Sequence, residues 1–144
     1  MFRTPYLIAT SVATLLVASV PSFGQSPTPA GGRVIIVKLV VKTGAMPYVF
    51  EPANITAERG DTLRFVDEAN VPHDVHFESH PAGAKLGAAT VSPYLTTTGQ
   101  TYDVVIDARF TDGKYKFVCD PHEMLGMRGT LTIEERTVAS HSIK

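Results

Sequence analysis

The 144-residue chain has little net charge, because thirteen Lys and Arg nearly cancel fourteen Asp and Glu to leave −1. Nucleic-acid-binding domains are usually strongly basic, so the charge argues against that class. Between residues 33 and 144 the sequence also lacks a long segment of helical period, and it has no internal repeat. The length predicts one domain, and these absences argue against a helical fold.

The N-terminal segment has almost no charge. Arg3 is the only charged residue before Arg33, and an apolar run of fourteen residues spans 7–20. This length is typical of a signal peptide and is short for a membrane span, although a retained membrane anchor is the alternative. Small residues around position 24 predict a signal peptide at 1–24, which places the mature protein in the periplasm or otherwise outside the cytoplasm.

Removal of this segment takes away one arginine and no acid, which leaves a mature net charge of −2. No membrane span is then expected in the mature form. Residues 25–32 read QSPTPAGG, a Pro- and Gly-rich spacer that packs little against other segments.

The remaining sequence alternates between apolar and polar residues in short runs separated by Gly, Pro and Asp. Strands are predicted at 33–42, 54–57, 62–68, 101–107, 114–119 and 129–134. This pattern predicts an all-β fold, an antiparallel Greek-key β-sandwich, over residues 33–136. Residues 79–100 are the least regular and suggest a short helix or a long loop, and 137–144 are expected to form a disordered tail.

The chain has a single cysteine, Cys119, so no disulfide can form within it. His122 follows three residues later and Met127 five after that. Thiolate, imidazole and thioether are soft ligands that suit copper, and two His, one Cys and a weak axial Met form a blue-copper electron-transfer site. The segment therefore predicts three ligands of one copper ion.

The second histidine ligand is predicted to be His73. If residues 73–77 are a strand, His73 shares its inner face with Val75 and Phe77, while His76 points outward. Cys119 shares an inward face with Tyr115 and Phe117 by the same alternation. Met124 is expected at the rim, and His76, His80, Asp120 and Glu123 are expected to be exposed.

These segments resemble the cupredoxins, the small blue type 1 copper proteins that include plastocyanin, pseudoazurin and amicyanin. The resemblance spans about residues 33–135 and is carried by 110–133, by Pro72–Phe77 and by Tyr48–Ile55. The first histidine segment is most similar to that of amicyanin, whereas the Cys-His-Met spacing is that of plastocyanin and pseudoazurin. One residue departs from the pattern, since Asp74 stands where these proteins usually carry an Asn that ties the two ligand segments together.

Two functions follow from this resemblance. The first is an electron carrier, not an enzyme, which exchanges single electrons with redox partner proteins such as c-type cytochromes or a periplasmic oxidoreductase. The second is a periplasmic copper carrier that delivers the metal to another protein. A Cys-His nucleophile lacks an orienting third group here, and a copper enzyme such as a nitrite reductase lacks a second set of ligands.

Overall fold

The computed structural model describes residues 31–135. The predicted signal peptide at 1–24, most of the spacer at 25–32 and the predicted tail at 137–144 lie outside the described residues. The elements are β1 Val34–Val41, β2 Tyr48–Glu51, β3 Asn54–Glu58, β4 Thr62–Asp67, β5 His76–Ser79, η1 Gly87–Ala89, β6 Thr101–Val105, β7 Gly113–Val118, η2 Asp120–Leu125 and β8 Arg128–Glu134. Within this range there is no helix with the length and apolar character needed to cross a membrane.

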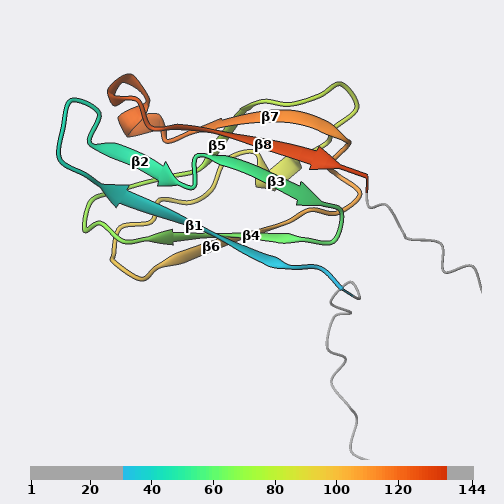
Figure 1. The fold of residues 1–144 in the computed structure, drawn as a ribbon, viewed down its shortest axis with the longest axis horizontal. Coiled ribbons are helices and arrows are strands. Elements are labelled where there is room, and N and C mark those ends of the chain that lie inside the picture. The colour runs from blue at the N-terminus through green and yellow to red at the C-terminus, as the bar shows by residue number, and fades with distance from the viewer. Residues whose placement is uncertain (1–30, 136–144) are drawn as a thin grey trace, which may run out of the picture.

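The strands form two four-stranded sheets that pack face to face (Figure 1). The first sheet has the order β2-β1-β4-β6, and the second has the order β3-β8-β7-β5. The predicted β-sandwich is confirmed, as are the predicted strands. In the irregular stretch 79–100, Ser79 ends β5, and the residues after it hold η1 and isolated bridges to His73 and His76.

The direction of two strand pairs differs from the predicted antiparallel arrangement. β1 runs parallel to β4, and β3 runs parallel to β8, while the other four pairs are antiparallel. The chain crosses to the second sheet as β3 before it returns as β4, so β1 and β4 enter the first sheet from the same end. An alternating pattern assigns faces but not strand direction, which explains the difference.

The core lies between the sheets and is rich in aromatic rings. Phe117 of β7 makes edge contacts with Phe50 of β2 and Phe65 of β4, with ring centroids 4.8 and 5.7 Å apart. Tilted or perpendicular ring pairs of this kind stabilise a core beyond the burial of their area. Because β7 supplies Phe117 to this contact, the strand that leads to Cys119 is fixed by both sheets.

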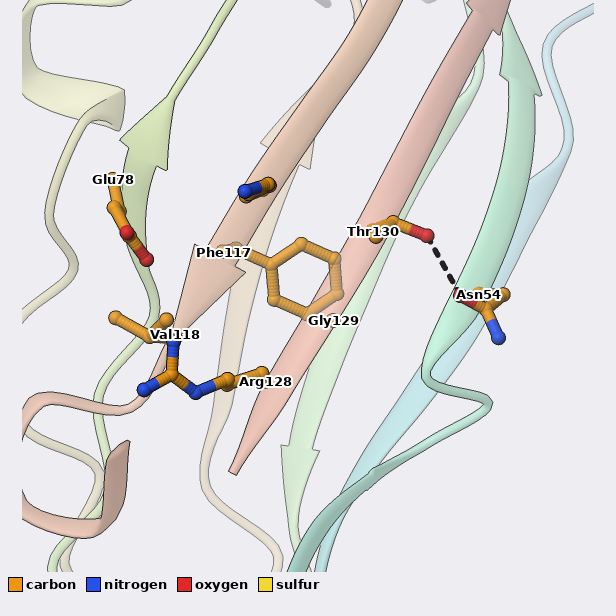
Figure 2. A pocket seen from close by; sticks show the side chains of 8 residues that line it. Asn54, Glu78, Phe117, Val118, Arg128, Gly129 and Thr130 are labelled. Carbon is orange, nitrogen blue, oxygen red and sulfur yellow. Dashed lines mark hydrogen bonds between the residues drawn. The ribbon is translucent and has the colours of Figure 1, made fainter. Parts of the chain in front are cut away.

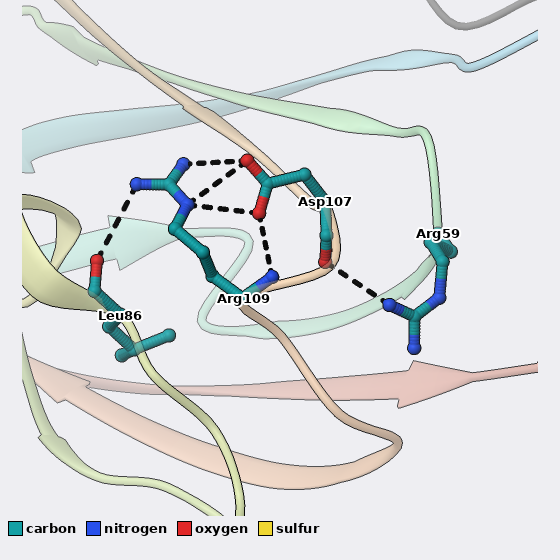
Figure 3. Close-up of polar contacts among 4 residues, drawn as sticks. All are labelled: Arg59, Leu86, Asp107 and Arg109. Atoms are coloured by element: carbon teal, nitrogen blue, oxygen red, sulfur yellow. Dashed lines mark hydrogen bonds and ion pairs between the residues drawn. The ribbon is translucent and has the colours of Figure 1, made fainter.

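Polar contacts close the end of the sandwich where β6 leads toward β7 (Figure 3). The carboxylate of Asp107 accepts hydrogen bonds from the backbone N–H and the Nε of Arg109, each at 2.9 Å. Arg109 Nη1 also donates to the Leu86 carbonyl at 3.5 Å, and Arg59 Nη1 donates to the Asp107 carbonyl at 3.3 Å. β7 starts near this end, so Cys119, which follows β7, emerges at the opposite end.

Candidate metal centre

Cys119 directly follows β7 and lies in the interior of the sandwich. Tyr115, Phe117 and Cys119 are all fully buried, which confirms the inward face predicted from alternation. The thiol therefore lies at the inner edge of the sandwich, just beyond the last residue of the strand.

The loop after Cys119 folds back on itself. His122 N–H donates to the Cys119 carbonyl at 2.9 Å, and Cys119 N–H donates to the Met127 carbonyl at 3.1 Å. Gly126 has φ +90°, a left-handed conformation that residues with a side chain rarely adopt. A Cβ at this position would also lie 2.2 Å from the sulfur of Met46. Glycine thus lets the loop turn and the 42–47 hairpin cover it.

His73 lies near Cys119 but belongs to a different segment, the one that precedes β5. It is fully buried and lies in an isolated bridge, in which His73 N–H donates to the Leu95 carbonyl at 2.9 Å and Leu95 N–H donates back at 2.7 Å. β5 begins only at His76, so the strand predicted from residue 73 is shorter than expected. The predicted faces hold for Val75 and Phe77, which are buried, but Asp74 is buried as well.

The side chains of His73, Cys119 and His122 form one cluster of donor atoms. The sulfur of Cys119 lies 3.5 Å from Nδ1 of His73 and 3.3 Å from Nδ1 of His122. One donor atom from each residue lies within 4.8 Å of the others. Metal–sulfur and metal–nitrogen bonds of about 2.3 and 2.0 Å at tetrahedral angles separate two ligand atoms by about 3.5 Å, so the spacing fits a single ion.

Met127 follows the loop that carries His122. It is fully buried and belongs to the same core as Cys119. Its N–H donates to the His122 carbonyl at 3.1 Å, which ties it to the loop that carries the histidine. Met124, by contrast, is 94% exposed, as expected for a rim residue.

Tyr48 packs against His122, the partly exposed histidine of the cluster, and was not singled out from the sequence. Its ring stacks on that of His122 with centroids 3.8 Å apart and an angle of 17° between the planes. It also meets His73 edge-on at 6.0 Å. Alternation in β2 could have indicated this residue. Tyr48 stands two positions before the buried Phe50 and therefore shares its face of the strand.

Asp74 ties the two segments of the cluster together. Its Oδ1 accepts a hydrogen bond from Asp120 N–H at 2.7 Å. This is the connection that the usual Asn makes in the resemblance described above. Burial raises the pKa of Asp74, although the hydrogen bond from Asp120 N–H opposes the effect.

A hydrogen bond and an ion pair hold the η2 loop to the outer face of the second sheet. Asp120 Oδ1 lies 2.8 Å from Nδ1 of His76, and Glu123 lies 3.0 Å from Arg128. The prediction that His76 is a solvated surface residue and that Asp120 and Glu123 are exposed charges was therefore incomplete. His76 is only partly exposed, and both acids have partners.

Comparison with known proteins gives the same picture. The family described as copper binding proteins, plastocyanin/azurin family, matches residues 35–134. The chain belongs to this family. It is 36% identical over 102 residues to plastocyanin of Scenedesmus fuscus, an alignment that covers 69% of this chain and 99% of that protein.

Solved structures agree with this assignment. Oxidised plastocyanin of Dryopteris crassirhizoma matches with a TM-score of 0.57 and 28% identity, covering 69% of this chain and 99% of the other. Pseudoazurin of Methylobacterium extorquens AM1 matches with a TM-score of 0.52 and 27% identity. This match covers 72% of this chain and 76% of the pseudoazurin chain. The resemblance to cupredoxins inferred from the sequence is confirmed.

As a cupredoxin, the protein is a blue copper electron carrier. The pKa values of His73 and Cys119 in the cluster are consistent with metal binding. Burial, together with the neighbouring His122, lowers the pKa of His73 to about 4, so its imidazole is neutral and able to bind a metal at pH 7. Burial raises the pKa of the Cys119 thiol to about 12. The thiolate is the form that binds metals, so copper must displace the thiol proton when it enters the site.

Proposed function

We propose that the mature protein exchanges single electrons through one copper ion held by His73, Cys119, His122 and Met127. The proposal rests chiefly on the two Nδ1 atoms that lie 3.5 and 3.3 Å from the Cys119 sulfur. Bound copper supplies the one-electron change between Cu(II) and Cu(I). Met127 is assigned as the axial ligand because it is buried in the same core as Cys119 and its backbone N–H donates a hydrogen bond to the His122 carbonyl.

The packing around the cluster keeps the donor atoms in place. His73, Cys119 and Met127 are fully buried, and His122 is partly covered by the ring of Tyr48. Rigid donors undergo little rearrangement when the charge of the site changes. This rigidity favours electron exchange over the delivery of copper to another protein, which needs donors that open easily.

The surface around His122 suits short encounters with a redox partner. Met124 and Leu125 of η2 and Met46 of the hairpin are exposed by 94%, 44% and 63%. A small apolar contact area permits association without tight binding. We refer to these three residues as the apolar end.

We place the protein outside the cytoplasm, with c-type cytochromes or a periplasmic oxidoreductase as its partners. The N-terminal apolar run of the sequence supports this location. Within residues 31–135, the three side chains of the cluster are the only group of three or more His, Cys, Asp and Glu arranged to hold a metal. A single site of this kind favours a carrier over a copper enzyme.

Absorption spectroscopy and voltammetry test the proposal. The copper-loaded protein should show an intense thiolate-to-copper band and a reversible one-electron wave, and Cys119→Ser should lose the band. Met124→Leu is the control and should keep both. A band that survives in the Cys119→Ser protein would refute the ligand assignment. An irreversible wave, together with rapid surrender of copper to a chelator, would favour the copper carrier.

A further inference from the structure

Asp67 is an acidic residue at a position where the strand pattern places an apolar one. It is the last residue of β4, it follows Leu63 and Phe65 on the inner face of that strand, and it is fully buried. Within residues 31–135 its Oδ2 has no hydrogen-bond partner, and it takes part in no ion pair. Burial of a carboxyl group with so few partners costs stability, so the fold alone does not account for this residue. A local rule that is broken in this way marks functional sites.

Elsewhere in the sandwich, polar side chains contact groups that satisfy them, as two examples show. On the outer face of the second sheet, Thr130 donates a hydrogen bond to Asn54 Oδ1 at 2.7 Å (Figure 2). Just before β4, the fully buried Asp61 accepts hydrogen bonds from the N–H groups of Arg33 and Glu58 at 2.9 and 3.0 Å. Asp61 therefore stabilises the beginning of the same strand.

The carboxyl group of Asp67 fixes the start of the segment that leads to His73. Its Oδ1 accepts a hydrogen bond from Ala69 N–H at 2.9 Å, the bond from a side chain to the backbone two residues later that forms an Asx-turn. Residues 70–72 separate Ala69 from His73, and the last of them is Pro72, whose ring fixes φ and restricts the residue before it. A short segment with a fixed turn at one end and a proline at the other relates the position of His73 to that of Asp67.

The main chain of Asp67 supports the other neighbour of His73. Asp67 N–H donates to the Gln100 carbonyl at 2.9 Å. The side chain of Gln100 accepts a hydrogen bond from Thr96 N–H at 2.9 Å. Thr96 directly follows Leu95, the residue that pairs with His73 in the isolated bridge. Both routes begin at Asp67 and end at His73, so together they form a closed ring of contacts.

We propose that Asp67 is a positioning residue for the copper site, which holds His73 in place before the metal binds. The inference rests on the ligand assignment proposed above, because His73 must be a ligand for its position to matter. His73 is separated from Cys119 by 46 positions and lies outside the strands, so local structure alone does not fix it. A donor that is already held in place loses less conformational freedom when the metal binds, which raises the affinity.

The affinity for Cu(I), measured by competition with a chelator, tests the proposal in three variants. Asp67→Ala removes the acceptor of Ala69 N–H and should lower the affinity about tenfold, the loss expected for one buried hydrogen bond. Asp67→Asn keeps Oδ1 and should bind Cu(I) like the unmodified protein. Asp61→Asn is the matched control. It should lower the free energy of unfolding but leave the affinity unchanged, because Asp61 lies at the other end of β4.

Amide hydrogen exchange in the copper-free protein gives a second measurement that does not depend on the metal. In Asp67→Ala the N–H groups of His73 and Leu95 should exchange about tenfold faster, because the ring of contacts that holds them is opened. The N–H of Leu131, in the central strand β8, should change much less. In Asp61→Asn the order should be reversed, since that variant weakens the fold as a whole.

Three outcomes contradict the proposal. An unchanged affinity in Asp67→Ala would show that the carboxyl group does not act on the site. Equal losses in Asp67→Ala and Asp67→Asn would assign the effect to the charge and not to the hydrogen bond. Exchange that accelerates equally at His73 and Leu131 in Asp67→Ala would show a role in the fold alone.

The unmodified protein provides a test that holds even where Asp67→Ala does not fold. In native-state exchange the N–H groups of Ala69, His73 and Leu95 should open with the same free energy, because they belong to one ring of contacts. Unequal values would overturn the proposal. None of these measurements uses the absorption band or the voltammetry that test the electron-carrier function, so failure of one proposal is distinguishable from failure of the other.

Discussion

Tyr48 stacks on His122, with ring centroids 3.8 Å apart and nearly parallel planes. The contact joins the beginning of β2 to the loop that carries the partly exposed histidine. Because His122 lies on a short 3₁₀ segment and not in a strand, the tyrosine ring restricts the positions that the imidazole can take.

Replacing Tyr48 by leucine should weaken copper binding, because the imidazole loses its stacking partner. Aromatic pairs contribute about 0.5–1.5 kcal/mol, which corresponds to an affinity lowered by about 2- to 10-fold. Competition with a chelator measures the change. Tyr48→Phe keeps the stack and should bind copper like the unmodified protein; an equal loss in both variants would rule out stacking as the cause.

Replacing Met127 by leucine should raise the reduction potential, because the site loses a weak donor that favours Cu(II). The rise is about 60 mV for each tenfold loss of Cu(II) affinity relative to Cu(I). Voltammetry on Met124→Leu provides the control, since Met124 is 94% exposed and should leave the potential unchanged. A raised potential in Met124→Leu with an unchanged potential in Met127→Leu would instead assign Met124 as the axial ligand.

Leu125→Glu should slow electron self-exchange about tenfold, because two molecules that meet through their apolar ends then bring like charges together. The copper spectrum should not change. Val34→Glu is the matched control, since Val34 is exposed and lies at the start of β1, the far end of that strand from the hairpin. NMR line broadening in mixtures of the two oxidation states measures the rate, and an unchanged rate in Leu125→Glu would argue against electron entry near His122.

Asp61→Asn should lower the free energy of unfolding at pH 7 by about 1–3 kcal/mol, because a buried hydrogen-bonded carboxylate is lost. Burial alone would raise the pKa of Asp61, but hydrogen bonds from Arg33 and from Glu58 N–H outweigh it and lower the pKa. The contribution is therefore fully present above the pKa of the unfolded chain.

This contribution disappears as the pH falls through the lower pKa of the folded protein. Urea unfolding at a series of pH values should show the difference between Asp61→Asn and the unmodified protein shrinking toward low pH. A difference that grows on acidification would mean that the ionised carboxylate does not stabilise the fold.

The sequence predicts much of the fold and of the cluster because both depend on local patterns. Spacing alone places Cys119 and His122 on one loop, and alternation turns Cys119 inward from β7. For His73 the alternation gave the correct direction, even though the residue lies in a bridge before β5 and not in a strand.

The contacts that sequence patterns missed join segments far apart in the chain. Tyr48 meets His122 only because the β1–β2 hairpin reaches over the η2 loop, and nothing near either residue encodes that approach. The hydrogen bond between Asp120 and His76 depends in the same way on the neighbouring positions of β5 and β7. Parallel pairing of β1 and β4 was missed because alternation is identical for both strand directions.

The bridge between His73 and Leu95 affects the order in which the site assembles. Cys119 and His122 are already close in a short peptide, whereas His73 is separated from Cys119 by 46 positions. The first two residues are near each other along the chain in any conformation, whereas His73 joins them only where the tertiary fold brings its segment to the loop. A metal that binds all of them stabilises the folded domain by mass action, because the complete set of donors exists only in the folded chain.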